Sequence, residues 1–319
     1  MASKRKGVNG GGKGKQRGTR TREIPRNPAS TESITAEISG LLENKDFATI
    51  EEASAFLSEH LGKRLTAYGR SSPHTPLDKA QDLMYDAWDS GDPQERVAFA
   101  ELALALSADC ADAYSLLADE KAVSPPEAKA YLEEAVLAGR RAVGEHAFDE
   151  DVGHFWGILE TRPYMRARLR LAQNAMEMGD RPGGIAHMKD MLRLNPGDNQ
   201  GIRYLLLTTL IEEGDDAGVG ELLEAYDDGT ASWLYDRALW LFRRENRSAE
   251  STAALNDALN SNAYVPAYLT GKKRQPRRPP QLHRGRRWFG SGGVRSWIEG
   301  AVGRNSWSAG LASRAAAPP

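Results

Sequence analysis

The stretch HFWGILETRPYMRARLRLAQNAMEMGDRPGGIAHMKDMLRLNP, residues 154–196, decides the fold of this chain. When Met165 is counted as position 1, small or apolar residues recur at helical spacing, which predicts two consecutive helices. Two helices can cross closely only where the facing side chains are short. We therefore interpret residues 165–196 as one helical hairpin. Its positions 7, 8, 11, 20, 24, 27 and 32 are Leu171, Ala172, Ala175, Gly184, Met188, Met191 and Pro196.

The same pattern recurs in four other windows, two upstream and two downstream. The downstream windows start at Asn199 and Ser232, so the last three starts are 34 and 33 residues apart, and the upstream windows start at Leu77 and near Cys110. A period of about 34 residues is typical of tetratricopeptide repeats. The alternative is an ordinary bundle of antiparallel helices of similar length. We predict an all-α, tetratricopeptide-like α-solenoid of about five helical hairpins, in which each hairpin buries its apolar face against its neighbours.

Charge divides the chain into basic ends and an acidic body. Residues 1–26 carry nine Lys or Arg and one acidic residue, and residues 266–319 carry eleven and one, which leaves 22 basic and 42 acidic residues for the body. The first 30 residues hold too few apolar side chains to offset the entropy of ordering them. The predicted organisation is a disordered basic tail at 1–30, N-terminal helices at 31–67, a linker at 68–76, a helical-repeat domain at 77–265 with a joint at 145–164, and a disordered basic tail containing Gly, Arg and Trp at 266–319.

Composition narrows the functional classes further. A single cysteine, Cys110, excludes an intrachain disulfide framework and an all-cysteine metal cage. The longest apolar runs, such as Leu205–Ile211, are far shorter than the roughly 20 residues that cross a bilayer. The N-terminus lacks the apolar segment of a secretory signal. We expect a cytoplasmic protein without membrane association.

The segment HFWGILETRPYMRARLRLAQ, together with RLNPGDNQGIRYLLL at 193–207, resembles a family of bacterial tetratricopeptide-repeat proteins related to the suppressor-of-tumorigenicity-seven proteins. The resemblance covers roughly residues 75–272. It implies repeats that act as protein-interaction surfaces and assigns no enzymatic activity.

No group of residues predicts catalysis or metal binding. His146 and His154 flank an acidic run, but their spacing does not suit a helical pair of metal ligands, and the run is more simply a solvated turn. The other histidines are scattered, and no Ser, His and acid grouping or nucleophile elbow accompanies them. We therefore expect no catalytic residue, no metal and no cofactor.

Aromatic residues precede the best-formed repeat without belonging to it. Phe155, Trp156 and Tyr164 lie in a segment that no repeat requires. We interpret them as a structural joint that connects two groups of repeats.

A basic stripe marks the first helix of the same repeat. Arg162, Arg166 and Arg170 are four residues apart and therefore share one helix face. Guanidinium groups bind carboxylates in a bidentate geometry, so the stripe favours a partner with an acidic segment. The alternative is a solvated face balanced by nearby Glu and Asp. The positions that line the concave groove of tetratricopeptide repeats give the predicted partner-binding residues: Arg166, Arg170, Gln173, Arg203, Tyr204, Arg237, Trp240 and Arg243.

The predicted function is a non-enzymatic scaffold or adaptor that binds a peptide or protein segment in the groove of its repeats. The alternative is a nucleic-acid-associated factor, because Lys and Arg clusters in the tails can neutralise phosphates without a fold. The acidic body argues against that alternative.

Overall fold

The computed structural model describes residues 32, 35, 38, 47–61, 75–270, 272 and 273. The chain divides into two compact units, Met1–Ser71 and Ser72–Pro319, each of which is described by itself. The disorder predicted for residues 1–30 and for most of the C-terminal tail, and most of the linker predicted at 68–76, lie outside the described residues.

In the first unit, one described helix, α2, spans Ile50–Leu61. It begins after Thr49, whose hydroxyl accepts a hydrogen bond from the backbone N–H of Glu52 at 3.2 Å. The rings of Phe47 and Phe56 pack with their centroids 5.4 Å apart. Glu32, Thr35 and Ile38 are helical as well, in the region where the first N-terminal helix is predicted.

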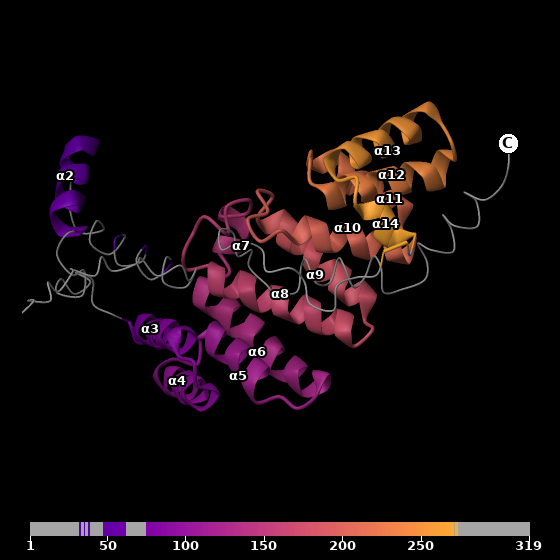
Figure 1. The fold of residues 1–319 in the computed structure, drawn as a ribbon. Helices are drawn as coiled ribbons and strands as arrows, with labels where there is room; N and C mark the ends of the chain where they lie inside the picture. The colour runs from indigo at the N-terminus through magenta and orange to yellow at the C-terminus, as the bar shows by residue number, and fades with distance from the viewer. Residues whose placement is uncertain are drawn as a thin grey trace, which may run out of the picture. The chain divides into compact units, whose positions relative to one another are not determined.

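In the second unit, the described residues form five helical hairpins and no strand (Figure 1). This arrangement confirms the predicted all-α solenoid of about five hairpins. Two shorter helices, α7 and α14, span Ala147–Glu150 and Val265–Leu269, so α14 extends past the domain boundary predicted at 265. The hairpins are α3 Pro76–Asp89 with α4 Pro93–Leu106, α5 Ala111–Glu120 with α6 Pro125–Val143, α8 Arg162–Glu177 with α9 Arg181–Leu194, α10 Ile202–Glu213 with α11 Asp216–Ala225, and α12 Ala231–Glu245 with α13 Ala249–Ser261.

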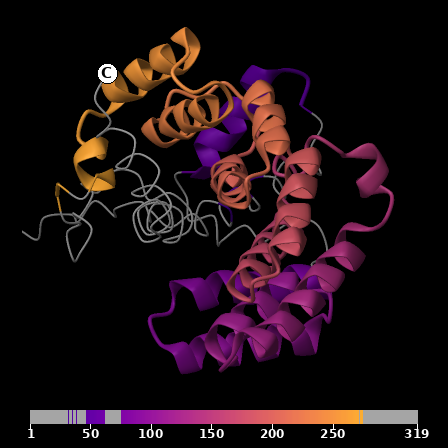
Figure 2. The same ribbon diagram turned by 90° about the vertical axis from the view of Figure 1, so that its right-hand side faces the viewer.

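Extensive packing occurs within each hairpin and between consecutive hairpins. Helix α5 packs on α8, α9 on α10, and α10 on α12. Figure 2 shows this succession from the purple hairpins to the orange ones. Since each hairpin covers the apolar face of the next, the core continues along the unit.

Two of the hairpin turns use the same Gly-Asp dipeptide. Gly179 and Gly214 adopt positive φ angles of 80° and 74°, which L-residues with a Cβ rarely adopt. The aspartates that follow accept hydrogen bonds from the first turns of α9 and α11: Asp180 from Gly183 N–H at 3.0 Å and Asp215 from Gly218 N–H at 2.9 Å. The dipeptide thus ends one helix and begins the next.

Small residues lie where the helices approach most closely. Ala172 on α8 is fully buried. A Cβ added to Gly184 on α9 would lie 2.7 Å from the Sδ of Met176 on α8, and one added to Gly139 on α6 would lie 2.9 Å from the Cα of Tyr164. The repeat pattern includes Gly184 as position 20, whereas the close approach at Gly139 depends on how α6 meets α8.

An aromatic cluster fills the segment between α6 and α8. The ring of Phe148 lies 5.0 Å from those of Phe155 and Tyr164, and the latter two side chains are almost fully buried. The backbone N–H of Gly153 donates to the carbonyl of Leu194 at 2.9 Å, which attaches the segment to the end of α9. Trp156 is half-buried, and the Arg162 guanidinium lies 5.5 Å from its ring centroid.

Within the described residues, no helix combines the length and the apolar character that crossing a membrane requires.

Candidate functional site

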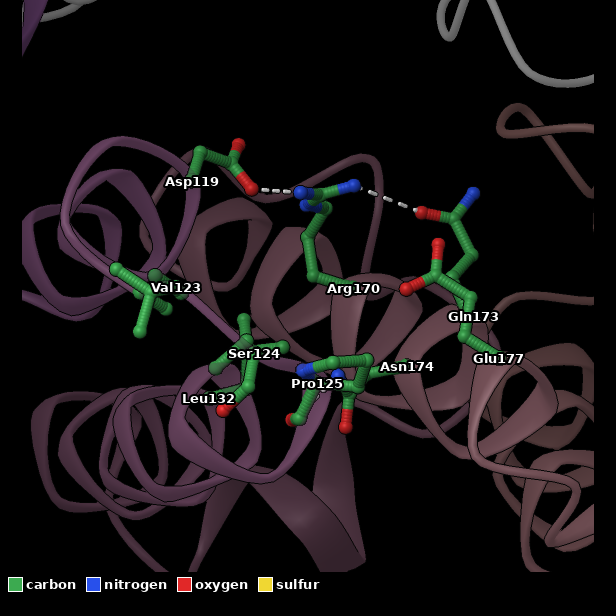
Figure 3. Close-up of a pocket in the computed structure, with 12 residues that line it drawn as sticks. Asp119, Val123, Ser124, Pro125, Leu132, Arg170, Gln173, Asn174 and Glu177 are labelled. Atoms are coloured by element: carbon green, nitrogen blue, oxygen red, sulfur yellow. Dashed lines mark hydrogen bonds and ion pairs between the residues drawn. The ribbon is translucent and has the colours of Figure 1, made fainter.

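A pocket of about 290 Å³ opens between the α5–α6 turn and helix α8 (Figure 3). Ser124 and Pro125 contribute from the turn, and α8 contributes four residues spaced three or four apart, which therefore share one face. The apolar part of the lining comes from Ala118, Ala122, Val123, Pro125, Ala128 and Leu132, and the polar part comes from Asp119, Ser124, Arg170, Gln173, Asn174 and Glu177.

Arg170 lies at the rim of this pocket and is already paired. Its guanidinium forms an ion pair with Asp119 of α5 and donates to the Oε1 of Gln173 at 3.1 Å (Figure 3). The Arg170 and Asp119 side chains are 42% and 48% exposed, so solvent screens the pair and we expect it to contribute at most about 1 kcal/mol.

Asn174 is the polar side chain that the fold buries most deeply in the pocket lining. Only 4% of the residue is exposed, and its Nδ2 donates to the carbonyl of Pro125 at 2.9 Å. Its Oδ1 is enclosed and has no hydrogen-bond partner, and the Nε of Arg170 is in the same condition. Each unpaired buried polar atom costs about 1–3 kcal/mol of stability, and because these atoms are enclosed a ligand reaches them only if the lining moves.

Arg166, one of the predicted groove residues, pairs with a buried carboxylate. Its Nε donates to the Oδ1 of Asp112 at 2.9 Å, and Asp112 also accepts from Gln81 at 2.9 Å. The Arg166 guanidinium lies 5.2 Å from the ring centroid of Trp88 on α3. These contacts connect α3, α5 and α8. Asp112 and Asp119 thus pair with Arg166 and Arg170, two of the three arginines of the basic stripe.

Arg203 and Tyr204 belong to a separate carboxylate cluster at the start of α10. Arg203 pairs with Asp198 at 2.9 Å and with Asp228 at 2.8 Å, and the Tyr204 hydroxyl donates to Asp228 at 2.5 Å. Partial burial opposes ionisation of Asp228, but hydrogen bonds from Tyr204, Arg203 and Thr230 outweigh it and lower its pKa to about 2. Both carboxylates of the cluster therefore have a partner within it.

The remaining predicted groove residues lie on α12. The Nε1 of Trp240 donates to the carbonyl of Asp216 at 2.9 Å, and Arg243 donates to the carbonyl of Ile211 at 2.8 Å. Arg237 is exposed. The eight predicted residues therefore occupy several places, and Arg170 and Gln173 lie together in the pocket of Figure 3.

Sequence reasoning missed Asp119, Asn174 and Glu177. Positions 2, 5, 6, 9, 12 and 13 of the first helix line the groove of tetratricopeptide repeats. Glu177 occupies position 13 of the repeat that starts at Met165, so the register could have identified it. Asp119 comes from the preceding hairpin, and it lies close to Arg170 because α5 packs on α8, which the repeat pattern does not specify.

Metal ligation finds no support within the part of the chain that the structure describes. No three His, Cys, Asp or Glu side chains gather there in a way that could hold a metal ion. His146 pairs instead with Glu150 on the same exposed turn, with 2.7 Å between Nε2 and Oε1.

Comparison with known proteins adds a family. A family model described as ST7 protein matches residues 74–243. Similar curated proteins include suppressor of tumorigenicity 7 protein-like from Gallus gallus, 30% identical over 220 residues, the protein of the same name from Rattus norvegicus, 28% identical over 222 residues, and the ST7 homolog from Drosophila melanogaster, 27% identical over 217 residues. These matches cover 62%, 62% and 60% of this chain but 40%, 39% and 40% of the relatives, so the chain spans about two-fifths of their length.

Among solved structures, the crystal structure of YrrB, described as a TPR protein with an unusual peptide-binding site, matches at 17% identity with a TM-score of 0.44. The match covers 69% of this chain and 96% of that chain.

Proposed function

This chain belongs to the ST7 protein family, and we propose that it acts as a non-enzymatic scaffold that binds a peptide or protein segment at the pocket between the α5–α6 turn and α8. The observation that carries the proposal is the pocket itself, whose lining combines apolar side chains from the α5–α6 turn and α6 with the charged side chains of Asp119, Arg170 and Glu177. Packed helices supply these side chains, which limits the entropy lost on binding.

The size of the pocket sets what it accepts. Sites for drug-sized ligands and cofactors occupy about 300–1,000 Å³, and this pocket of about 290 Å³ is at or below that range. It suits one side chain of a longer segment. We propose that the rest of such a segment follows the neighbouring first helices, where Arg203, Tyr204, Arg237, Trp240 and Arg243 lie.

Other expectations stay proposals. We propose that Phe155, Trp156 and Tyr164 act as the joint between the repeat groups. Support comes from the contact between the Phe155 and Tyr164 rings and from Trp156, which packs against the core cluster that contains them. The bacterial origin and the cytoplasmic location stay predictions. The nucleic-acid alternative depends on the basic tails, whose residues lie almost wholly outside the described ones.

Filling the pocket tests the proposed function. We expect Ala122→Phe to weaken the binding of selected peptides at least about tenfold, since the new ring occupies the space that a ligand side chain needs. The full chain is used to select peptides from a displayed library of random dodecamers, and fluorescence anisotropy then gives the Kd of each for both proteins.

Ala217→Phe provides the matched control, because Ala217 is exposed on α11 and does not line the pocket. Its peptide affinities should equal those of the unmodified chain. If no peptide is selected, or if Ala122→Phe binds the peptides unchanged, the pocket is not the binding site and the proposed function fails.

A further inference from the structure

We propose that the pocket selects a Lys or Arg side chain of the bound segment, rather than the acidic segment that the basic stripe predicts. This inference rests on the proposed function and specifies the chemistry of its partner. It follows from which polar groups of the pocket are paired and which are free.

The groups left for a ligand are mostly acceptors. The exposed carboxylates of Asp119 and Glu177 line the pocket and retain acceptor positions, although Asp119 also pairs with Arg170 and Glu177 also acts on that guanidinium through its charge. The Oδ1 of Asn174 has no donor but is enclosed. The sticks in Figure 3 place Glu177 beside Gln173 on the α8 side of the pocket. A side chain that carries several N–H donors matches this set, and Lys and Arg carry three and five donors.

The cationic group of the pocket is already in use. Arg170 is paired with Asp119 and donates to Gln173, so a ligand carboxylate would compete with Asp119 for its charge. The same carboxylate would also lie near Asp119 and Glu177, where like charges repel. One guanidinium stands against two carboxylates in the lining, a net charge of −1, and this balance favours a cation over an anion.

The apolar lining suits the stem of a long basic side chain. Ala122, Val123, Ala128 and Leu132 line the pocket, and Val123 is 91% exposed. Lys and Arg commonly lay their methylene groups on such surfaces and keep the charged end at a polar rim.

Long-range charge acts in the same direction. The body at 27–265 holds 42 acidic and 22 basic residues, so its field attracts a basic segment and repels an acidic one. Charge complementarity thus agrees with the local chemistry of the pocket.

A charge-removal cycle tests the inference with the full chain and the dodecamers selected from the library. We expect those peptides whose binding Ala122→Phe weakens to be enriched in Lys or Arg. In the best of them, arginine is replaced by citrulline, which keeps the shape and loses the charge. The replacement should weaken binding about fivefold to the unmodified chain and less than about twofold to Glu177→Gln, because exposed ion pairs contribute about 0.2–1 kcal/mol.

Glu134→Gln, on the exposed face of α6, provides the control. In this variant the replacement of arginine by citrulline should still weaken peptide binding about fivefold. The inference is overturned if the pocket-dependent peptides show no preference for Lys or Arg, or if the citrulline effect is the same in Glu177→Gln as in the unmodified chain. Either result still involves peptides whose binding Ala122→Phe weakens, so the proposed function would stand. If no peptide binds in a way that depends on the pocket, both the proposed function and this inference are overturned.

Discussion

Arg166→Met is expected to lower the free energy of unfolding by about 3–5 kcal/mol, because it leaves the carboxylate of Asp112 buried without its main partner. The Asp112 side chain is only 1% exposed, and Arg166 contacts it through two nitrogen atoms. Among the described side chains, Gln81 on α3 then provides the remaining hydrogen bond to this carboxylate. Urea denaturation of the full chain, followed by circular dichroism, measures the loss.

Two further variants separate the buried pair from a general loss of charge. Arg170→Met should change stability by less than about 1 kcal/mol, since its pair with Asp119 is exposed. Adding Asp112→Leu to Arg166→Met should recover much of the loss by removing the unpaired charge. If Arg166→Met unfolds at the same urea concentration as the unmodified chain, the pair does not hold the hairpins together.

We also expect the free energy of unfolding to fall as the pH rises from about 4 to 7, because the carboxyl of Asp236 has a raised pKa in the folded state. Burial raises the pKa of this carboxyl on α12 to about 7, Glu212 adds to the effect and Arg243 opposes it. In the unfolded chain the pKa returns to near 3.8, so between these values the folded state retains a proton that the unfolded state has lost. The free energy of unfolding then falls by about 1.4 kcal/mol for each pH unit in this range, so the total loss at pH 7 is about 4 kcal/mol.

Asp236→Asn provides the test, because the amide keeps the shape and does not titrate. We expect this variant to have a much smaller decrease in unfolding free energy between pH 5 and pH 8 than the unmodified chain, and to be more stable at pH 8. Asp257→Asn, at an exposed site on α13, should retain the full decrease. An identical pH dependence in Asp236→Asn and the unmodified chain would exclude Asp236 as the cause.

The hairpins could be predicted because the repeat pattern is local and redundant. Ala172, Gly184 and Met188 lie in the positions where two helices of one hairpin meet, and the structure places Ala172 and Met188 in the core with no exposed surface. The Gly-Asp turns are local as well, since each glycine and each capping aspartate acts within a few residues.

The partners of the polar side chains could not be predicted in the same way. Arg166 and Asp112 are 54 positions apart, and their pairing depends on how α8 packs against α5. On sequence alone, the basic stripe fits an external acidic segment as well as internal aspartates. The pocket depends on the same packing, because Asn174 reaches across 49 positions to Pro125. Periodicity identifies a helix face, but it does not identify the groups that the face meets.

Photo-crosslinking from Val123 tests the central claim, that a peptide occupies the pocket between the α5–α6 turn and α8, most directly. Val123 lines the pocket and is 91% exposed, so a photoreactive phenylalanine there can be accommodated, and Leu255 on α13, 43% exposed, provides a second position on a different hairpin. With a peptide selected by the full chain, irradiation should give a crosslinked product from position 123 and almost none from position 255. Equal crosslinking from both positions, or none from position 123, would contradict the account.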